Sequence, residues 1–143
     1  MNAKAILTAA AMLAVAVPQP ARAEPVTTEY YYKIKWGSFD EFMELYKRNH
    51  QPILDELKRQ GFITAMRIDT PLTHLAGTVR WDLRVTIVTK DEASAVGVTG
   101  PYADASTAAA KKLFPDKARF DAEERRRFSL LDEHWDVIVI PAE

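Results

Sequence analysis

The clearest alternation of apolar and polar positions lies in Thr78–Thr89. Apolar side chains occupy one set of alternate positions: Val79, Trp81, Leu83, Val85 and Ile87. Neighbouring side chains of a strand point to opposite faces of its sheet, so this segment is predicted to be a strand with one apolar face. The same period predicts a strand over Glu29–Trp36, ended by Gly37, and two further strands are predicted over Phe62–Asp69 and Trp135–Ile140.

A helical period replaces the alternation in Phe39–Gln60. Its apolar side chains fall within an arc of about 120° on a helical wheel. The Ser38-x-x-Glu41 spacing predicts a capping box at the start, and Gly61 supplies the end. Pro52 lies inside the segment and lacks a backbone N–H, so we expect a kink there.

A second helical region is predicted in two pieces, separated at Phe114-Pro115-Asp116. Ala105–Leu113 is rich in alanine, the residue with the highest helix propensity. Asp116 is expected to cap the second piece. In that piece Phe120, Glu124, Arg127, Phe128 and Leu131 fall at helical spacing. The preceding stretch, Lys90–Asp104, is predicted to be a connector with a short helical turn at its start.

The predicted order is strand–helix–strand–strand–helix–strand. Right-handed crossovers around a central hairpin give an α+β, ferredoxin-like fold: a four-stranded antiparallel sheet of order 4-1-3-2 with both helices on one face. Two separate hairpins are the alternative pairing. That pairing leaves the first helix without a sheet to cover.

The first 23 residues have the layout of a secretory signal peptide. A basic start at Met1–Lys4 precedes the apolar run Ala5–Val17, and Ala21-Arg22-Ala23 offers small residues for cleavage. A membrane-spanning helix needs about 20 apolar residues, more than this run has. An uncleaved amphipathic anchor is the alternative, although the run has no polar face. We therefore expect a single domain, Glu24–Glu143, in the periplasm or secreted, without membrane contact after cleavage.

Composition narrows the functional classes. The chain has 143 residues, 48% of them hydrophobic, which is typical of a globular domain. Its net charge of −1 argues against a general nucleic-acid binder. It has no cysteine, which excludes disulfides, thiolate catalysis and cysteine-ligated zinc. No nucleic-acid partner is expected.

The chain resembles the dimeric α+β barrel superfamily in its order of elements, its length, and the segment Tyr46–Pro52 followed by Gly61-Phe62-Ile63. That group includes cofactor-free monooxygenases, lactone isomerases, polyketide cyclases and haem-degrading enzymes. The resemblance implies the fold and a homodimer. Since no complete signature of one enzyme branch is present, it carries over no catalytic set, and no cofactor is predicted.

His50 is the best candidate for chemistry, because it is the strongly polar side chain on the apolar arc of the first helix. One interpretation is a cavity between helix and sheet that binds a small organic molecule, with His50 as general base and Tyr46 as proton donor. Tyr32 and Trp81 are the candidate ligand-binding residues. The other interpretation is a non-catalytic ligand-binding or assembly domain in which His50 is structural.

A metal site built from the three histidines is not expected. His74 and His134 are predicted near opposite edges of the sheet, and His50 lies about eleven residues along the helix, too far for common coordination. His134 is expected to cap the C-terminus of the second helix instead. Three tryptophans are expected in the core between sheet and helices: Trp36, Trp81 and Trp135.

Charged side chains are predicted on the sheet face away from the helices: Lys33, Lys35, Arg80, Asp82 and Arg84. They could bind a small anion, or form a solvated face with cross-strand pairs. If two sheets pack together in a barrel, Asp69, Asp82 and Asp136 should neutralise these cations, because unpaired buried charge is costly.

Two further segments each have two interpretations. The run from Glu123 to Arg127 is either a docking patch or a solvated helix face with ion pairs. The stretch from Gly97 to Tyr102 is either a lid over a pocket or a plain connector.

Overall fold

The computed structural model describes residues 23–73 and 77–142, in which four strands form one antiparallel sheet. The strands are β1 (Val26–Ile34), β2 (Ile63–Asp69), β3 (Leu83–Thr89) and β4 (Leu131–Val139). Their order, β2-β3-β1-β4, is the predicted one. All three pairings are antiparallel, which excludes the two-hairpin alternative because β1 pairs with both β3 and β4.

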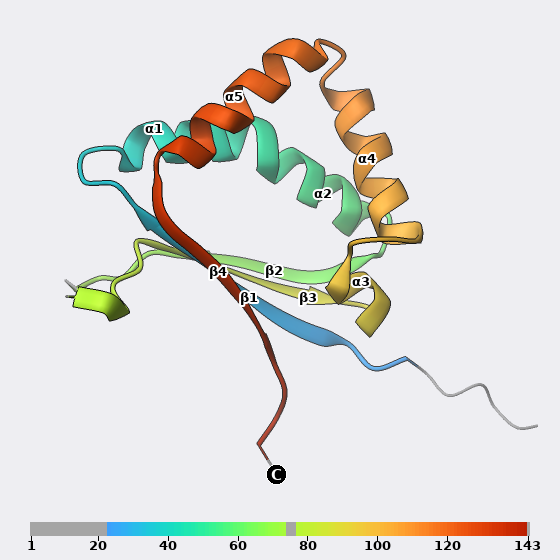
Figure 1. Ribbon diagram of the computed structural model, residues 1–143. Coiled ribbons are helices and arrows are strands. Elements are labelled where there is room, and N and C mark those ends of the chain that lie inside the picture. The colour runs from blue at the N-terminus through green and yellow to red at the C-terminus, as the bar shows by residue number, and fades with distance from the viewer. Residues whose placement is uncertain (1–22, 74–76, 143) are drawn as a thin grey trace, which may run out of the picture.

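The longer helices cover one face of this sheet, as Figure 1 shows. The helical segments are α1 (Phe39–Leu45), the π-helical turn η1 (Tyr46–His50), α2 (Gln51–Arg59), the 3-10 turn η2 (Gly77–Val79), α3 (Glu92–Val96), α4 (Pro101–Leu113) and α5 (Lys117–Ser129). The predicted break between α4 and α5 is confirmed. None of the helices in the described ranges is long and apolar enough to cross a membrane.

The first helical segment is interrupted by a π-helical turn rather than by a simple kink. Pro52 has no N–H to donate to the carbonyl of Arg48. The chain adapts one residue earlier, where the N–H of Gln51 donates to the carbonyl of Tyr46, five residues back. Both Tyr46 and Asn49 of this wider turn are buried, Tyr46 against the Tyr32 ring of β1 and Asn49 against Glu123 of α5. Gly61, with φ +80°, then ends α2 in the conformation expected for a C-terminal glycine.

The core lies between the sheet and these helices. Leu83, Val85 and Ile87 form the buried face of β3, as their alternation predicted. Phe42 and Tyr46 pack against this face from the first helical segment and are fully buried. A buried side chain of this size contributes about 2–3 kcal/mol through removal of its apolar surface from water.

The prediction of three core tryptophans is wrong. Trp36 is 82% exposed, because β1 ends at Ile34 and its alternation stops before Trp36. Trp81 precedes β3 and contacts Tyr31 edge-on at 6.0 Å, and Trp135 stacks on Tyr31 at 5.3 Å. Tyr31 alternates with the inward-facing Tyr32 and therefore points away from the helices. Trp81 and Trp135, which contact Tyr31, lie on the same outer face of the sheet.

Of the two predicted N-terminal caps, one is present. The Asp116 carboxylate accepts from the N–H of Arg119 at 3.0 Å and caps α5. The predicted capping box at Ser38 is wrong, because the Ser38 side chain makes no capping hydrogen bond. Glu41 instead accepts two hydrogen bonds from Arg126 of α5, at 2.7 and 2.8 Å.

Candidate functional site

A cavity of about 260 Å³ lies between the sheet and the helical layer, at the π-helical turn. We call it the His50 cavity. Its lining residues come from β1, β3, the first helical segment and the start of α4: Tyr30, Tyr32, Tyr46, His50, Ile53, Leu54, Leu57, Val85, Ile87, Tyr102 and Ser106. Apart from His50, whose ring is discussed below, none of these side chains carries a charge near neutral pH. The cavity therefore suits a small, neutral, largely apolar molecule.

Three rings of the cavity wall contact one another around His50. The centroid of the His50 ring lies 5.2 Å from that of Tyr46, one helical turn earlier. Tyr46 meets the Tyr32 ring edge-on at 6.2 Å. The structure therefore brings together three of the four residues predicted for the site: His50, Tyr46 and Tyr32.

Burial keeps the imidazole of His50 neutral. Loss of water around the ring lowers the pKa of His50 from its ordinary 6.5 to about 4. The positive charge of Arg127 lowers this pKa further, and Glu124 partly opposes it. At pH 7 the ring is therefore neutral and has an acceptor nitrogen available.

Tyr46 provides a hydroxyl with no partner. Its side chain is fully buried, and its Oη has no hydrogen-bond partner among the described residues. Burial also raises the pKa of Tyr46 well above its ordinary value, so the group stays a proton donor. An unsatisfied buried hydroxyl costs about 1–3 kcal/mol, which a ligand oxygen in the cavity would recover.

A buried ion pair lies next to the ring of Tyr46. Arg127 of α5 is only 2% exposed and pairs with Glu124 through two hydrogen bonds, at 3.0 and 2.6 Å. Its guanidinium carbon lies 5.7 Å from the centroid of the Phe42 ring and 5.9 Å from that of Tyr46. Such stacking on aromatic faces suits arginine, whose planar cation is weakly hydrated.

Trp81 does not line the His50 cavity. It lies on the opposite face of the sheet and borders a separate cavity of about 360 Å³ with Trp36 and Arg80. Because β3 begins at Leu83, the alternation that put Trp81 on the inner face does not extend back to it.

Within the described residues, His134 and His50 do not belong to a metal site. His134 stacks on Tyr32 at 4.3 Å, and its Nδ1 lies 2.8 Å from the carbonyl oxygen of Tyr31. It therefore holds β4 against β1 and does not cap α5 as predicted. His74 lies outside the described residues, and within residues 23–73 and 77–142 no cluster of side chains could hold a metal ion.

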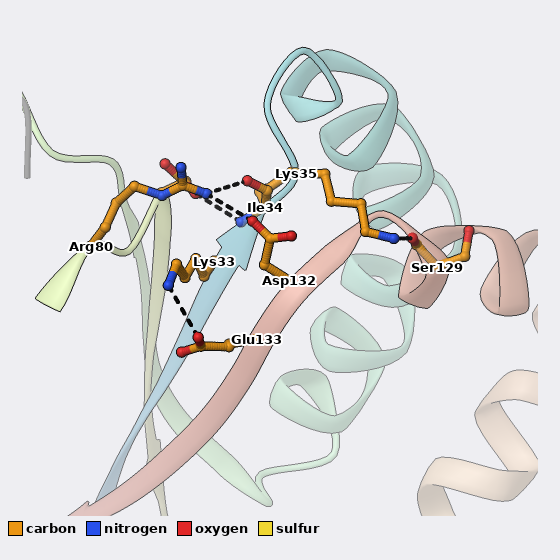
Figure 2. Close-up of polar contacts among 8 residues, drawn as sticks. Lys33, Ile34, Lys35, Arg80, Ser129, Asp132 and Glu133 are labelled. Atoms are coloured by element: carbon orange, nitrogen blue, oxygen red, sulfur yellow. Dashed lines mark hydrogen bonds and ion pairs between the residues drawn. The ribbon is translucent and has the colours of Figure 1, made fainter. Parts of the chain in front are cut away.

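Not all of the side chains predicted for the charged face lie on it. Figure 2 shows those near the end of β1. Lys35 follows the end of β1 and donates to the carbonyl of Ser129 at 2.7 Å. Arg80 precedes β3 and donates to the carbonyl of Ile34 at 2.6 Å and to Asp132 at 3.2 Å. Arg80 therefore joins the end of β1 to the start of β4, and Lys35 joins the end of β1 to the C-terminus of α5. Neither lies on the predicted face, because both strands are shorter than the alternation suggested.

The charges that do lie on the open face are paired. Arg84 contacts Asp69 at 3.2 Å and Glu29 at 3.7 Å, and Lys33 pairs with Glu133 at 3.1 Å. Asp82 pairs with Arg80 at 3.3 Å, as expected. Asp136 makes no ion pair within the described part of the chain, contrary to expectation. The pairing leaves little free positive charge on this face to bind an anion.

The burial of Asn49 was not predicted: it is 1% exposed and donates to Glu123 at 3.0 Å, although it does not line the His50 cavity. Two contributors to the site itself were also missed. Tyr102 lines the cavity from α4, inside the segment treated as a lid or connector. Arg127 belongs to a run interpreted as a docking patch or a solvated helix face. A signal was present for Arg127, since it falls at helical spacing with Phe120 and Glu124.

Comparison with known proteins defines the fold. No protein-family model and no curated protein matches the chain. A solution structure of a hypothetical protein from Arabidopsis thaliana matches it with a TM-score of 0.52 and 10% identity, covering 85% of this chain and 92% of that one. A dabb-family protein with a ferredoxin-like fold from Mesorhizobium loti matches with a TM-score of 0.51 and 9% identity, covering 83% and 98%. The chain therefore has the ferredoxin-like fold of such proteins, as the resemblance implied.

Proposed function

We propose that the His50 cavity binds a small, neutral, largely apolar carbonyl compound and that His50 and Tyr46 move a proton on it without a cofactor. The observation that carries this proposal is the pairing of a neutral imidazole with an unpartnered tyrosine hydroxyl on one cavity wall. Tyr46 would donate to the carbonyl oxygen. His50 would remove the proton from the adjacent carbon, as in isomerases and cyclases that pass through an enolate.

Binding is tested with 2-indanone, a neutral bicyclic ketone, by ligand-observed NMR. The Tyr46→Phe variant is expected to bind it about fivefold to tenfold more weakly, because one hydrogen bond to the ketone is lost. The same variant should unfold at no lower denaturant concentration than the wild type, since the removed hydroxyl has no hydrogen-bond partner in the described part of the chain. Tyr31→Phe, on the opposite face, is the matched control and should bind as the wild type does. Equal affinity of all three proteins would contradict the proposal.

Proton transfer is tested by exchange of the acidic methylene protons of 2-indanone in D₂O. The wild type should accelerate this exchange above the buffer rate, and His50→Gln should lose the acceleration while still binding the ketone. In each turnover His50 takes the proton, Tyr46 stabilises the enolate oxygen, and a deuteron returns to carbon. Exchange at the same rate in both proteins would exclude His50 as the base.

Ligand binding without turnover is the second candidate function. One observation favours it: a base with a pKa of about 4 is far weaker than the value near operating pH that suits general-base catalysis. Binding of 2-indanone without accelerated exchange would establish this function instead.

We also propose that the chain forms a homodimer through the open face of the sheet. Tyr31, Trp81 and Trp135 form an aromatic cluster there, and Arg84 is already neutralised by Glu29 and Asp69. Paired charges can be buried at far lower cost than unpaired ones. The edge strand β4 adds exposed apolar side chains, among them Val137.

The Trp135→Glu variant tests the dimer by sedimentation velocity. A carboxylate in the aromatic cluster is expected to shift the protein from dimer to monomer at micromolar concentration, because it would be buried without a partner. Phe128→Glu, an exposed site on α5, is the control and should leave the dimer intact. A wild type that sediments as a monomer would refute this interface.

Export remains our proposal for the compartment. The segment 1–22 lies outside the described residues, and the first strand, β1, begins at Val26, shortly after the predicted cleavage site. Intact-mass analysis of protein expressed in a bacterial host should find a mature chain beginning at Glu24 in the periplasmic fraction. A cytoplasmic chain that retains its first 23 residues would contradict export.

A further inference from the structure

A further cavity, larger than the His50 cavity, lies within the helical layer. It has a volume of about 530 Å³, within the range of small-molecule sites. We call it the helical cleft. Figure 1 shows α4 and α5 meeting in an inverted V above α2. The walls of the helical cleft come from these three helices and from the corner between α4 and α5: Ile53, Ser106, Thr107, Ala110, Lys111, Phe114, Pro115, Lys117, Phe120 and Asp121.

The interior of the cleft is apolar. Phe114 and Phe120 stack with ring centroids 4.7 Å apart and form one wall at the corner between α4 and α5. Ala110 and Ile53 add small and branched aliphatic surface. Since aliphatic and aromatic walls bind alkyl chains through the hydrophobic effect, this part of the cleft fits a hydrocarbon chain rather than a polar molecule.

The rim of the cleft is cationic. Lys111 and Lys117 both line it, whereas Asp121 is the one carboxylate of the lining and is engaged by Lys117. Lys111 makes no ion pair within residues 23–73 and 77–142. Two ammonium groups against one carboxylate leave a net positive charge beside an apolar interior. The hydroxyls of Ser106 and Thr107 lie in the same wall and can donate to an anion.

We propose that the helical cleft is a binding site for an amphipathic carboxylic acid, a medium-chain fatty acid in its simplest form. The carboxylate lies at Lys111, and the alkyl chain packs against Phe114 and Phe120. This ligand differs in charge from the neutral molecule proposed for the His50 cavity. The two cavities share Ile53 and Ser106, so the sites are adjacent but have separate determinants.

Calorimetric titration with decanoate, below its micellar range, tests the site. The wild type should bind decanoate at least about tenfold more tightly than decan-1-ol, which has the same chain and no charge. Lys111→Ala should remove most of this difference. Lys112→Ala is the matched control, since Lys112 is the next residue but does not line the cleft, and it should bind as the wild type does. Equal affinity for acid and alcohol in the wild type would overturn the proposal.

A second variant tests the place of binding. Thr107 is exposed, so Thr107→Trp should fold, as circular dichroism can verify, while filling the cleft and abolishing decanoate binding. His50→Gln should leave decanoate binding unchanged, which separates this site from the His50 cavity. Wild-type affinity in folded Thr107→Trp would overturn the proposal. A third result would also overturn it: no decanoate binding by the wild type, together with a change from dimer to monomer in Thr107→Trp. The cleft would then be an interface between copies of the chain.

Discussion

Glu124→Gln is expected to lower the free energy of unfolding by about 3–5 kcal/mol, because it leaves a buried arginine without its counterion. The Arg127 side chain is 2% exposed, and both of its hydrogen bonds to Glu124 lie within the protein. Glutamine keeps the size of the side chain but not the charge. Chemical denaturation monitored by tryptophan fluorescence measures the loss.

A neighbouring ion pair supplies the control. Arg126 and Glu41 also form two hydrogen bonds, but both side chains are about half exposed. Exposed pairs contribute about 0–1 kcal/mol, so Glu41→Gln should have a small effect. The double variant Glu124→Gln, Arg127→Met should recover much of the lost stability, since it removes the uncompensated charge. Similar losses for Glu124→Gln and Glu41→Gln would mean that Arg127 is solvated.

Acidification is expected to destabilise the protein between about pH 6.5 and pH 4 through His50. The folded state holds the pKa of His50 at about 4, whereas the unfolded chain has the ordinary value of 6.5. In this window the unfolded chain binds a proton that the folded chain does not, so stability falls as the pH falls and is fully present above pH 6.5. A difference of this size corresponds to about 3 kcal/mol.

Denaturation midpoints of the wild type and His50→Gln across this window isolate the contribution of His50. The variant should lose the part of the pH dependence that lies between pH 6.5 and pH 4, while carboxylates continue to act at lower pH. Parallel curves for the wild type and His50→Gln would show that the His50 ring is hydrated.

The strand order and the inward position of His50 followed from the sequence, because both depend on periodicity. The alternation in β3 and the helical arc of Phe39–Gln60 each specify which face is buried, and the connection rules favour the observed arrangement over two separate hairpins. The π-helical turn did not follow. Pro52 predicts a lost hydrogen bond, but the backbone can respond by a kink or by a wider turn, and packing against the sheet decides between them.

The errors concentrate where strands end. Trp36, Lys35 and Trp81 continue an alternating pattern by one or two residues beyond the hydrogen-bonded strand, and nothing in the pattern marks the boundary. The burial of Arg127 was not predicted, for a different reason. Its charge and the charged run around it predict a surface residue, whereas its burial depends on a carboxylate and aromatic rings that only the folded structure brings together.

The proposed chemistry requires that His50 lies in its cavity as a neutral base. The pKa of the His50 ring can be measured by NMR on protein labelled at histidine, with His50→Gln to assign the signal. We predict a titration near pH 4, shifted lower still by bound 2-indanone, which displaces the remaining water. A ring that titrates near pH 6.5 and does not respond to the ketone would contradict it.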